Sequence, residues 1–392
     1  MAAPQPAPPP EPPIFRTQDE LEEIFLLLPT AADLLRASAA CAPFRHLITD
    51  HAFLRRYRAL HPPPLIGVVD DDAFFPAQTP HPSAVAARAF AGFDFSCSSF
   101  VPTNAGRTWR AIDLFDGRVL LGGAPEEEAC DLDHLQLLVR ELAVCDPVFR
   151  RYILLPAVPG DLTALVPEPD LLDMDTFLAP GDDEQDPLSF RVMCLVRCRR
   201  NMVLLVFSSV DGQWHALTFD QWSVPDAFDP YKDGLLNRQF VGRCFCWHPP
   251  FLNELLLLDT HSMEFSAVSL PPEQPQCHNF VIVEAAEGML GMLAGINDGH
   301  NDNGPYRLVY SILRNNQWHS ENVIPLPEKY GVILFGVAGG YVLMQAYNTS
   351  GPEKLWFFSV DVKTLQVELF GEGSSGGELY AGFPPSLCAP TI

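Results

Sequence analysis

The sequence has few basic residues and no long apolar run. Of its 392 residues, 49 are Asp or Glu and only 25 are Lys or Arg, so the formal net charge is −24. This charge would repel a phosphate backbone over most of the surface, and we expect no nucleic acid partner. No segment approaches the roughly 18 consecutive apolar residues that a membrane span requires. We therefore expect no membrane insertion either.

The common signatures of catalysis are also missing. The sequence contains no Gly-rich phosphate loop, no Gly-x-Ser-x-Gly turn and no His-Glu-x-x-His helix. The nearest candidate for a metal site combines Cys194 and Cys198 with Cys244 and Cys246, but this spacing fits no standard zinc motif. We expect these cysteines to serve as small core residues. The sequence thus predicts a protein without catalytic activity, metal or cofactor.

Cysteine usage and the amino terminus favour the cytoplasm or the nucleus. The ten cysteines are scattered between Cys41 and Cys388 and do not resemble a compact disulfide framework. Residues 1–13 are rich in proline and alanine and have neither the basic start nor the apolar stretch of a secretory signal. Repeated prolines without backbone donors predict an extended, disordered tail over these residues.

Residues 14–62 have the pattern of a small helical module. Apolar residues recur at steps of three and four, and acidic residues open the first segment, where they suit the positive end of a helix dipole. Thr30 can cap a second helix with Asp33 as the reciprocal acid, and the prolines at 62–64 end the helical pattern. So short a module is only marginally stable by itself. We therefore expect it to bind a partner.

Residues 63–392 have the pattern of an all-β domain. Short apolar runs alternate with Gly, Pro, Asn and Asp, which is typical of many antiparallel strands. Trp109, Trp214 and Trp318 follow one another at intervals of 105 and 104 residues, about twice the length of one four-stranded blade. A closed ring also removes the exposed sheet edges that so many strands create. We predict a β-propeller of about six blades, with a β-sandwich as the alternative.

The helical stretch contains a series of short elements, which are Leu21-Glu22-Glu23-Ile24-Phe25, Leu28-Pro29, Asp33-Leu34, Ala37-Ser38, Cys41, Phe44-Arg45, Leu47-Ile48 and Phe53. Together they resemble the F-box, the motif that joins substrate receptors to cullin-RING ubiquitin ligases. His61-Pro62-Pro63-Pro64-Leu65 and the segment from Val144-Cys145-Asp146-Pro147 to Leu155-Pro156 are similar to plant-type F-box proteins with a C-terminal propeller-like associated domain.

This resemblance implies a non-catalytic adaptor of a Skp-cullin-F-box ubiquitin ligase, which recruits a target protein for ubiquitination. The partners would be a Skp-type linker protein, through it a cullin, and a target that the sequence does not name. The residues expected to bind the linker are Leu21, Ile24, Phe25, Leu28, Pro29, Leu34, Leu47 and Ile48. An apolar face on the linker would complete their core.

Two departures and two alternatives accompany this hypothesis. The opening Leu-Pro pair of the family is replaced by Arg16-Thr17, and the usual valine before Cys41 is Ala40, so docking should be weaker than is usual in the family. The helices could instead pack only against the β domain. The chain could also be a free-standing propeller, either a binding protein or a hydrolase, which would show convergent acids and histidines at the centre of the ring.

One acidic segment is a candidate surface for a basic partner. Residues 161–186 contain nine carboxylates and no Lys or Arg. Charge on such a surface sets the rate of encounter more than the final affinity. The candidate residues are Asp173, Asp175, Asp182, Asp183 and Glu184. The alternative is a solvated acidic loop.

Overall fold

The computed structural model describes residues 17–383 and Ile392, apart from residues 62, 71–72, 91, 103–106, 126–137, 139, 167–169, 182–185, 187, 221–235, 250–252, 272–278, 298–305, 327–329, 349–354 and 373–376. The predicted tail over residues 1–13 lies outside them. The chain divides into two compact units, one ending at Pro63 and including Phe383, the other running from Pro64 to Gly382 and including Ile392. No helix in the described part is long and apolar enough to cross a membrane.

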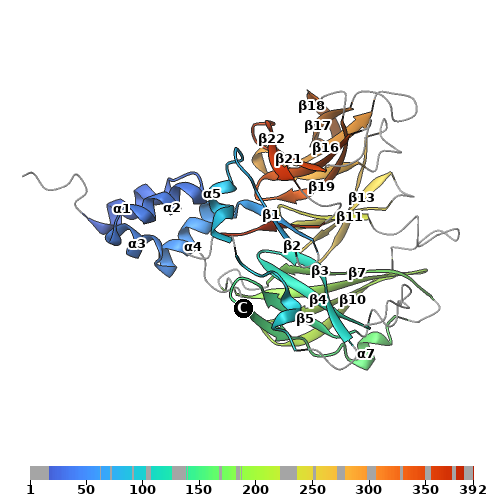
Figure 1. Cartoon of the computed structure of the whole chain (residues 1–392). Helices are drawn as coiled ribbons and strands as arrows, with labels where there is room; N and C mark the ends of the chain where they lie inside the picture. The colour runs from blue at the N-terminus through green and yellow to red at the C-terminus, as the bar shows by residue number, and fades with distance from the viewer. Residues whose placement is uncertain are drawn as a thin grey trace, which may run out of the picture. The chain divides into compact units, whose positions relative to one another are not determined.

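The first unit contains four short helices: α1 (Gln18–Leu26), α2 (Ala31–Ala40), α3 (Ala42–Ile48) and α4 (His51–Leu60) (Figure 1). Three of them begin at a side-chain cap, because Thr17, Thr30 and Asp50 each accept backbone N–H groups of the first turn. The Thr30 hydroxyl also donates to Asp33 Oδ2 at 2.6 Å, so Asp33 assists the second cap as expected.

The core of the first unit forms where the four helices meet. Leu34, Ile48 and Tyr57 are fully buried there. The Tyr57 hydroxyl donates to the Leu28 carbonyl at 3.1 Å, which ties α4 to the end of α1. Arg56 of α4 reaches Glu22 at 3.0 Å and Glu23 at 2.5 Å on α1. These surface pairs add little stability, so buried apolar contacts hold the unit together.

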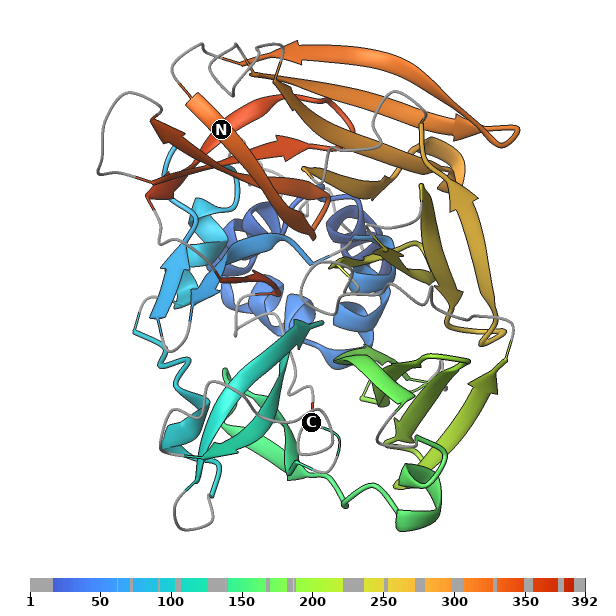
Figure 2. The same ribbon diagram turned by 90° about the vertical axis from the view of Figure 1, so that its right-hand side faces the viewer.

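The second unit is a six-bladed β-propeller (Figure 2). Blade one consists of β1 (Leu65–Asp70), β2 (Ala73–Pro76) and β23 (Glu378–Ala381). Blade two consists of β3 (Arg107–Phe115), β4 (Arg118–Pro125), β5 (Leu142–Asp146) and β6 (Arg151–Leu154). Blade three consists of β7 (Leu171–Pro180), β8 (Phe190–Cys198), β9 (Met202–Ser208) and β10 (Gln213–Phe219).

The remaining three blades follow the same up-and-down order. Blade four consists of β11 (Leu236–Val241), β12 (Cys244–His248), β13 (Glu254–Asp259) and β14 (Phe265–Ser269). Blade five consists of β15 (Phe280–Glu284), β16 (Leu290–Asn297), β17 (Tyr306–Arg314) and β18 (Gln317–Pro325). Blade six consists of β19 (Tyr330–Ala338), β20 (Tyr341–Asn348), β21 (Trp356–Asp361) and β22 (Val367–Glu372).

Short helical segments connect some of the strands. They are α5 (Ala84–Ala87), η1 (Arg88–Phe90), η2 (Cys97–Ser99), α7 (Gly160–Thr163) and η4 (Ala286–Gly288). The innermost strands of the ring are β3, β7, β11, β15, β19 and β23, since these strands contact one another between blades. The prediction of a propeller of about six blades is confirmed, and the sandwich alternative is wrong.

The tryptophan repeat has a physical basis in two of its three members. Trp214 and Trp318 occupy the second position of β10 and β18, the outermost strands of blades three and five. The Trp214 indole N–H donates at 2.8 Å to the carbonyl of Pro156, which follows the outermost strand of blade two. The Trp318 indole N–H donates at 2.8 Å to the carbonyl of Ser269, the last residue of the outermost strand of blade four. Trp109 lies on the innermost strand β3, so its spacing does not relate equivalent positions.

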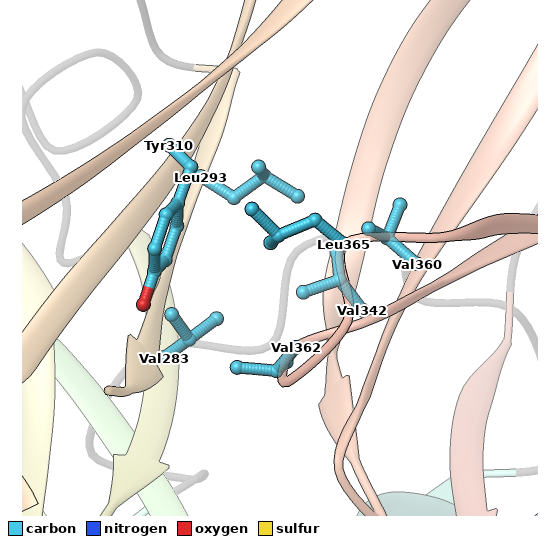
Figure 3. Close-up of a pocket in the computed structure, with 7 residues that line it drawn as sticks. All are labelled: Val283, Leu293, Tyr310, Val342, Val360, Val362 and Leu365. Atoms are coloured by element: carbon cyan, nitrogen blue, oxygen red, sulfur yellow. The ribbon is translucent and has the colours of Figure 1, made fainter. Parts of the chain in front are cut away.

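Apolar seams between neighbouring blades form the core of the propeller. One seam joins blades five and six, where branched side chains and Tyr310 face one another across the gap between the two sheets (Figure 3). This hollow has no space that would hold a water molecule. The residues that line it are Val283, Leu293, Tyr310, Val342, Val360, Val362 and Leu365. It is therefore a packing seam and no ligand site.

The ring closes where its last strand pairs with its first. Strand β23 pairs antiparallel with β1, with Val68 opposite Leu379. Gly377, immediately before β23, has a φ of +125°. A Cβ atom there would lie 2.5 Å from Val68 Cγ1 and 2.7 Å from the Val69 carbonyl oxygen. Only glycine fits this approach without strain.

We predict that Gly377→Ala lowers the free energy of unfolding by about 1–3 kcal/mol, because the new methyl group clashes with β1 and the backbone is held at positive φ. Urea denaturation followed by tryptophan fluorescence measures this change. The matched control is Gly160→Ala, where an added Cβ meets nothing within 4 Å. The control should change stability by less than about 0.5 kcal/mol. Equal stability of both variants would contradict the role of Gly377.

Candidate functional site

The eight residues expected to bind a linker protein divide into an inner and an outer group. Four of them are buried in the core of the helical unit: Phe25, Leu34, Leu47 and Ile48. Leu21 and Leu28 are half-buried, whereas Ile24 and Pro29 are exposed. The buried four hold the unit together, and the Phe25 ring packs edge-on against Phe44 at 5.0 Å between centroids. A partner that binds the folded unit meets the outer residues first.

The most exposed leucine of the helical unit is not among the eight residues expected from the sequence. Leu27, at the C-cap of α1, leaves 80% of its surface exposed, and Ile24, three residues earlier, leaves 39% exposed. Residues three apart lie on one side of a helix, so Ile24 and Leu27 form one apolar patch. The run Leu26-Leu27-Leu28 could have predicted an exposed leucine, because a helix cannot turn three consecutive leucines toward one core.

Two residues of the acidic segment form ion pairs with arginines of the propeller. Asp173 Oδ2 lies 2.6 Å from Arg197 Nη2. Asp175 lies 2.6 Å from Arg238 Nη1 and also accepts the indole N–H of Trp247 at 2.9 Å. Both carboxylates are thus already paired within the protein. The expected surface for a basic partner rests on Asp182, Asp183 and Glu184, which lie outside the described residues.

Charged residues from four innermost strands converge near the centre of the ring. Asp113 of β3, Asp175 of β7, Arg238 of β11 and Glu378 of β23 make up this ring-centre cluster. The Arg238 guanidinium pairs with both aspartates and lies 4.7 Å from the centroid of the Phe177 ring. Asp113 Oδ2 also accepts the backbone N–H of Leu178 at 2.7 Å.

Three carboxylates surround one guanidinium in this cluster, and the pKa values of Asp113, Glu378 and Arg238 are shifted. Burial raises the pKa of Asp113, although Arg238 and the Leu178 N–H oppose the shift. Loss of surrounding water and the charges of Asp113 and Asp175 raise the pKa of Glu378, again against Arg238. Burial disfavours the charge of Arg238, but Asp175 and Asp113 outweigh it and raise its pKa.

Polar side chains bridge the innermost strands elsewhere in the ring too. Gln239 Oε1 accepts the N–H of Ile282 in the next blade. Asn279 accepts the N–H of Leu334 at 2.7 Å and donates to the Val332 carbonyl at 2.8 Å. The bond from Asp113 to Leu178 repeats this arrangement. These bridges satisfy buried backbone groups between blades, and much of the ring-centre cluster has the same structural role.

One buried pair has the composition of a nucleophile and its base. His81 Nε2 lies 2.9 Å from Ser359 Oγ, and the Ser83 N–H donates to His81 Nδ1 at 3.1 Å. Because Nδ1 accepts, Nε2 carries the proton and donates to the serine. A general base would have to accept the serine proton instead. His81 is 2% exposed and Ser359 is fully buried, so the pair joins blade one to blade six.

The four cysteines considered as metal ligands lie on two strands. Cys194 and Cys198 of β8 and Cys246 of β12 are buried, and Cys244 is half-buried. Burial raises the pKa of both Cys194 and Cys246 to about 12, which disfavours the thiolates that zinc requires. Within the described ranges, no group of three or more His, Cys, Asp or Glu side chains has the geometry of a metal site.

Comparisons with known proteins do not identify a family for this chain. No family model matches this chain, and no curated protein sequence matches it. An oligogalacturonate lyase in complex with manganese is 10% identical, and the match covers 67% of this chain and 64% of that one, with a TM-score of 0.34. A post-proline cleaving enzyme from Rickettsia typhi is 9% identical over 92% of this chain and 58% of that one, with a TM-score of 0.33.

A fucose-specific lectin from Aleuria aurantia is 8% identical, with 67% of this chain and 77% of that chain covered and a TM-score of 0.33. The chain spans less than two thirds of the length of the lyase and of the peptidase. Two enzymes and a lectin at such low identity carry no argument about function, because one fold supports many unrelated activities.

We predict that Arg238→Met destabilises the propeller by about 3–5 kcal/mol, because it leaves the buried Asp113 and the half-buried Asp175 without their cation. Thermal and urea unfolding measure the loss. The matched control is Arg314→Met, which breaks an exposed pair with Glu321 at 2.7 Å. That change should cost less than about 1 kcal/mol. Similar effects of the two substitutions would show that the ring-centre cluster is not a structural clamp.

We predict a pH-dependent loss of stability that originates at His81. Burial lowers the pKa of His81 from 6.5 to about 4. Below pH 6.5 the unfolded chain therefore binds a proton that the folded chain does not, and stability falls by up to about 3 kcal/mol as the pH approaches 4. His81→Gln should remove this component from the pH profile of unfolding. The control His319→Gln, at an exposed histidine, should retain it. Identical profiles for all three proteins would refute the assignment.

Proposed function

We propose that this protein is a substrate-recognition adaptor of a Skp-cullin-F-box type ubiquitin ligase of the plant type. The helical unit binds a Skp-type linker protein and thereby a cullin, and the propeller holds a target protein. The adaptor does no chemistry itself. It raises the local concentration of the target beside a conjugating enzyme, and this proximity accounts for its effect. We place it in the cytoplasm, the nucleus or both.

The apolar patch of Ile24 and Leu27 is the observation that carries this proposal. The helical unit has already buried its core leucines, yet Leu27 keeps 80% of its surface in solvent. Exposed leucine beside exposed isoleucine favours contact with another protein. The patch lies on α1, within the segment that resembles the F-box. A linker with an apolar groove would cover the patch without unfolding the unit.

The propeller supports the second half of the proposal by its architecture. Its strands are joined by many loops at the two ends of the blades, and loops on a rigid scaffold commonly carry recognition. Asp113 and Asp175 of the ring-centre cluster are already held by Arg238, which fits a structural role better than general acid or base catalysis. A free-standing propeller, as a binding protein or a hydrolase, remains the second candidate because three carboxylates converge there.

Binding to a purified linker and cullin pair tests the adaptor proposal. We expect the wild-type chain to bind and Leu27→Asp to lose at least about tenfold in affinity, a cost of roughly 1.4 kcal/mol, because a carboxylate cannot enter an apolar groove. Isothermal titration calorimetry measures both constants. Circular dichroism verifies that the variant keeps its helices. Phe25→Asp is unsuitable for this purpose, because Phe25 belongs to the core and its substitution would unfold the unit.

Leu60→Asp is the matched control, since Leu60 lies in the same unit at the end of α4 and is 62% exposed. It introduces the same charge outside the patch, and we expect wild-type affinity. A wild-type chain that does not bind the linker would refute the adaptor proposal. Equal affinities of wild type and Leu27→Asp would show that the Ile24 and Leu27 patch does not carry the contact.

A further inference from the structure

Two consecutive glycines of β4 leave room for the side chains of Arg140 and Glu141, the two residues that precede β5. A Cβ atom on Gly122 would lie 2.9 Å from Arg140 Nη1, and a Cβ atom on Gly123 would lie 3.6 Å from Glu141 Oε2. Neighbouring residues of a strand face opposite sides of its sheet. The Arg140 guanidinium and the Glu141 carboxylate therefore lie on opposite faces of blade two.

The charges on these two faces are balanced differently. On the face of Glu141, Arg107 Nη1 of β3 lies 3.8 Å from the carboxylate. On the other face, Arg110 of β3 is directly opposite Gly122 in the strand register. Directly opposite residues extend their side chains from the same face, so the Arg110 side chain begins beside the Arg140 guanidinium. Within the described part of the chain, neither Arg110 nor Arg140 pairs with a carboxylate.

Arg140 is fixed in position although its charge has no partner. It lies in the sequence between Leu138 and Leu142, which are both buried in the apolar seam between blades two and three. Its Nε atom is buried and has no hydrogen-bond partner among the described residues. Burial lowers the pKa of Arg140, while the nearby Cys194 opposes the shift. A charge that loses water without gaining a partner costs stability, and such groups are often found where a ligand supplies the missing charge.

We propose that Arg110 and Arg140 bind a phosphate group on the face of blade two that carries Gly122. Each guanidinium can donate two parallel hydrogen bonds to an oxyanion. Two positive charges match the charge of about −2 on a phosphate monoester at neutral pH. Gly122 contributes through its lack of a side chain, since a larger residue would occupy the space beside the Arg140 guanidinium. This inference does not depend on the adaptor function.

The charge of the whole protein restricts the molecule that carries the phosphate. With a formal net charge of −24, the protein repels a long polyanion such as a nucleic acid. A single phosphate on a small molecule, or on one residue of a protein segment, brings little other negative charge with it. Both carriers present the same chemistry to the two arginines.

Titration of the full chain with inorganic phosphate at about 0.15 M ionic strength tests the site. We expect saturable binding with a dissociation constant of about 1 mM or tighter, measured by calorimetry. Arg110→Met and Arg140→Met should each weaken binding at least about tenfold, because each removes charge-assisted hydrogen bonds.

Arg107→Met is the matched control, because Arg107 lies on the same strand but on the face of Glu141. Residues three apart on a strand are separated by about 10 Å, a distance at which salt screens exposed charges. We therefore expect this variant to change the affinity for phosphate by less than about threefold.

Thermal unfolding without phosphate distinguishes a binding role from a structural role. Arg140→Met should unfold at the same temperature as the wild type or higher, because it removes an unpaired, half-buried charge and keeps an apolar stem. Phosphate should raise the unfolding temperature of the wild type but not of this variant. If Arg140→Met does not fold, Arg110→Met decides, because Arg110 is exposed.

A peptide with one phosphoserine and its unphosphorylated form identify the carrier. Tighter binding of the phosphopeptide than of inorganic phosphate supports a protein segment, and the reverse order supports a small molecule. Three results would overturn the proposal: no saturable binding of phosphate by the wild type, equal affinities of the wild type and Arg110→Met, or equal binding of the two peptides together with no binding of phosphate.

Discussion

The pairing of β23 with β1 is the contact on which the second unit depends. A propeller built from one chain has two ends, and each would leave an unpaired sheet edge. Here the last strand becomes the innermost strand of the blade that the first strands begin, so one sheet contains both ends of the β domain. The same pairing brings Glu378 to the ring-centre cluster. Closure therefore places a third carboxylate near Asp113 and Asp175, and Arg238 limits the repulsion.

The sequence was sufficient to predict the propeller but not its centre. Short strands, regular turns and the spacing of Trp214 and Trp318 are local features, and the two indoles occupy equivalent positions. The ring-centre cluster arises from residues as far apart as Asp113 and Arg238, which are separated by 125 positions. No local pattern relates them, because the partner of an innermost strand depends on how the ring closes. Trp109 has the same spacing but lies on the innermost strand β3, so its spacing relates no equivalent positions.

In the helical unit, caps were predictable and outward-facing residues were not. Thr30 and Asp33 lie within one turn, so their interaction follows from local geometry. The orientation of α1 depends on α4, because Tyr57 bonds to Leu28 just after the carboxyl end of α1 and Arg56 pairs with Glu22 and Glu23 in its middle. Helical periodicity defines an apolar stripe but not its edges. Phe25 thus faces inward with Phe44, while Leu27, outside the predicted stripe, faces solvent.

Arginine has a particular role in so acidic a protein. Arg118 and Arg191 are almost fully buried, and each reaches a carbonyl beyond its own blade: Arg118 donates to Leu188 and Arg191 to Thr260. Arg238 joins blades two, three and four through carboxylates. A guanidinium suits such positions, because its planar fork satisfies several acceptors at once. These three guanidiniums therefore hold neighbouring blades together.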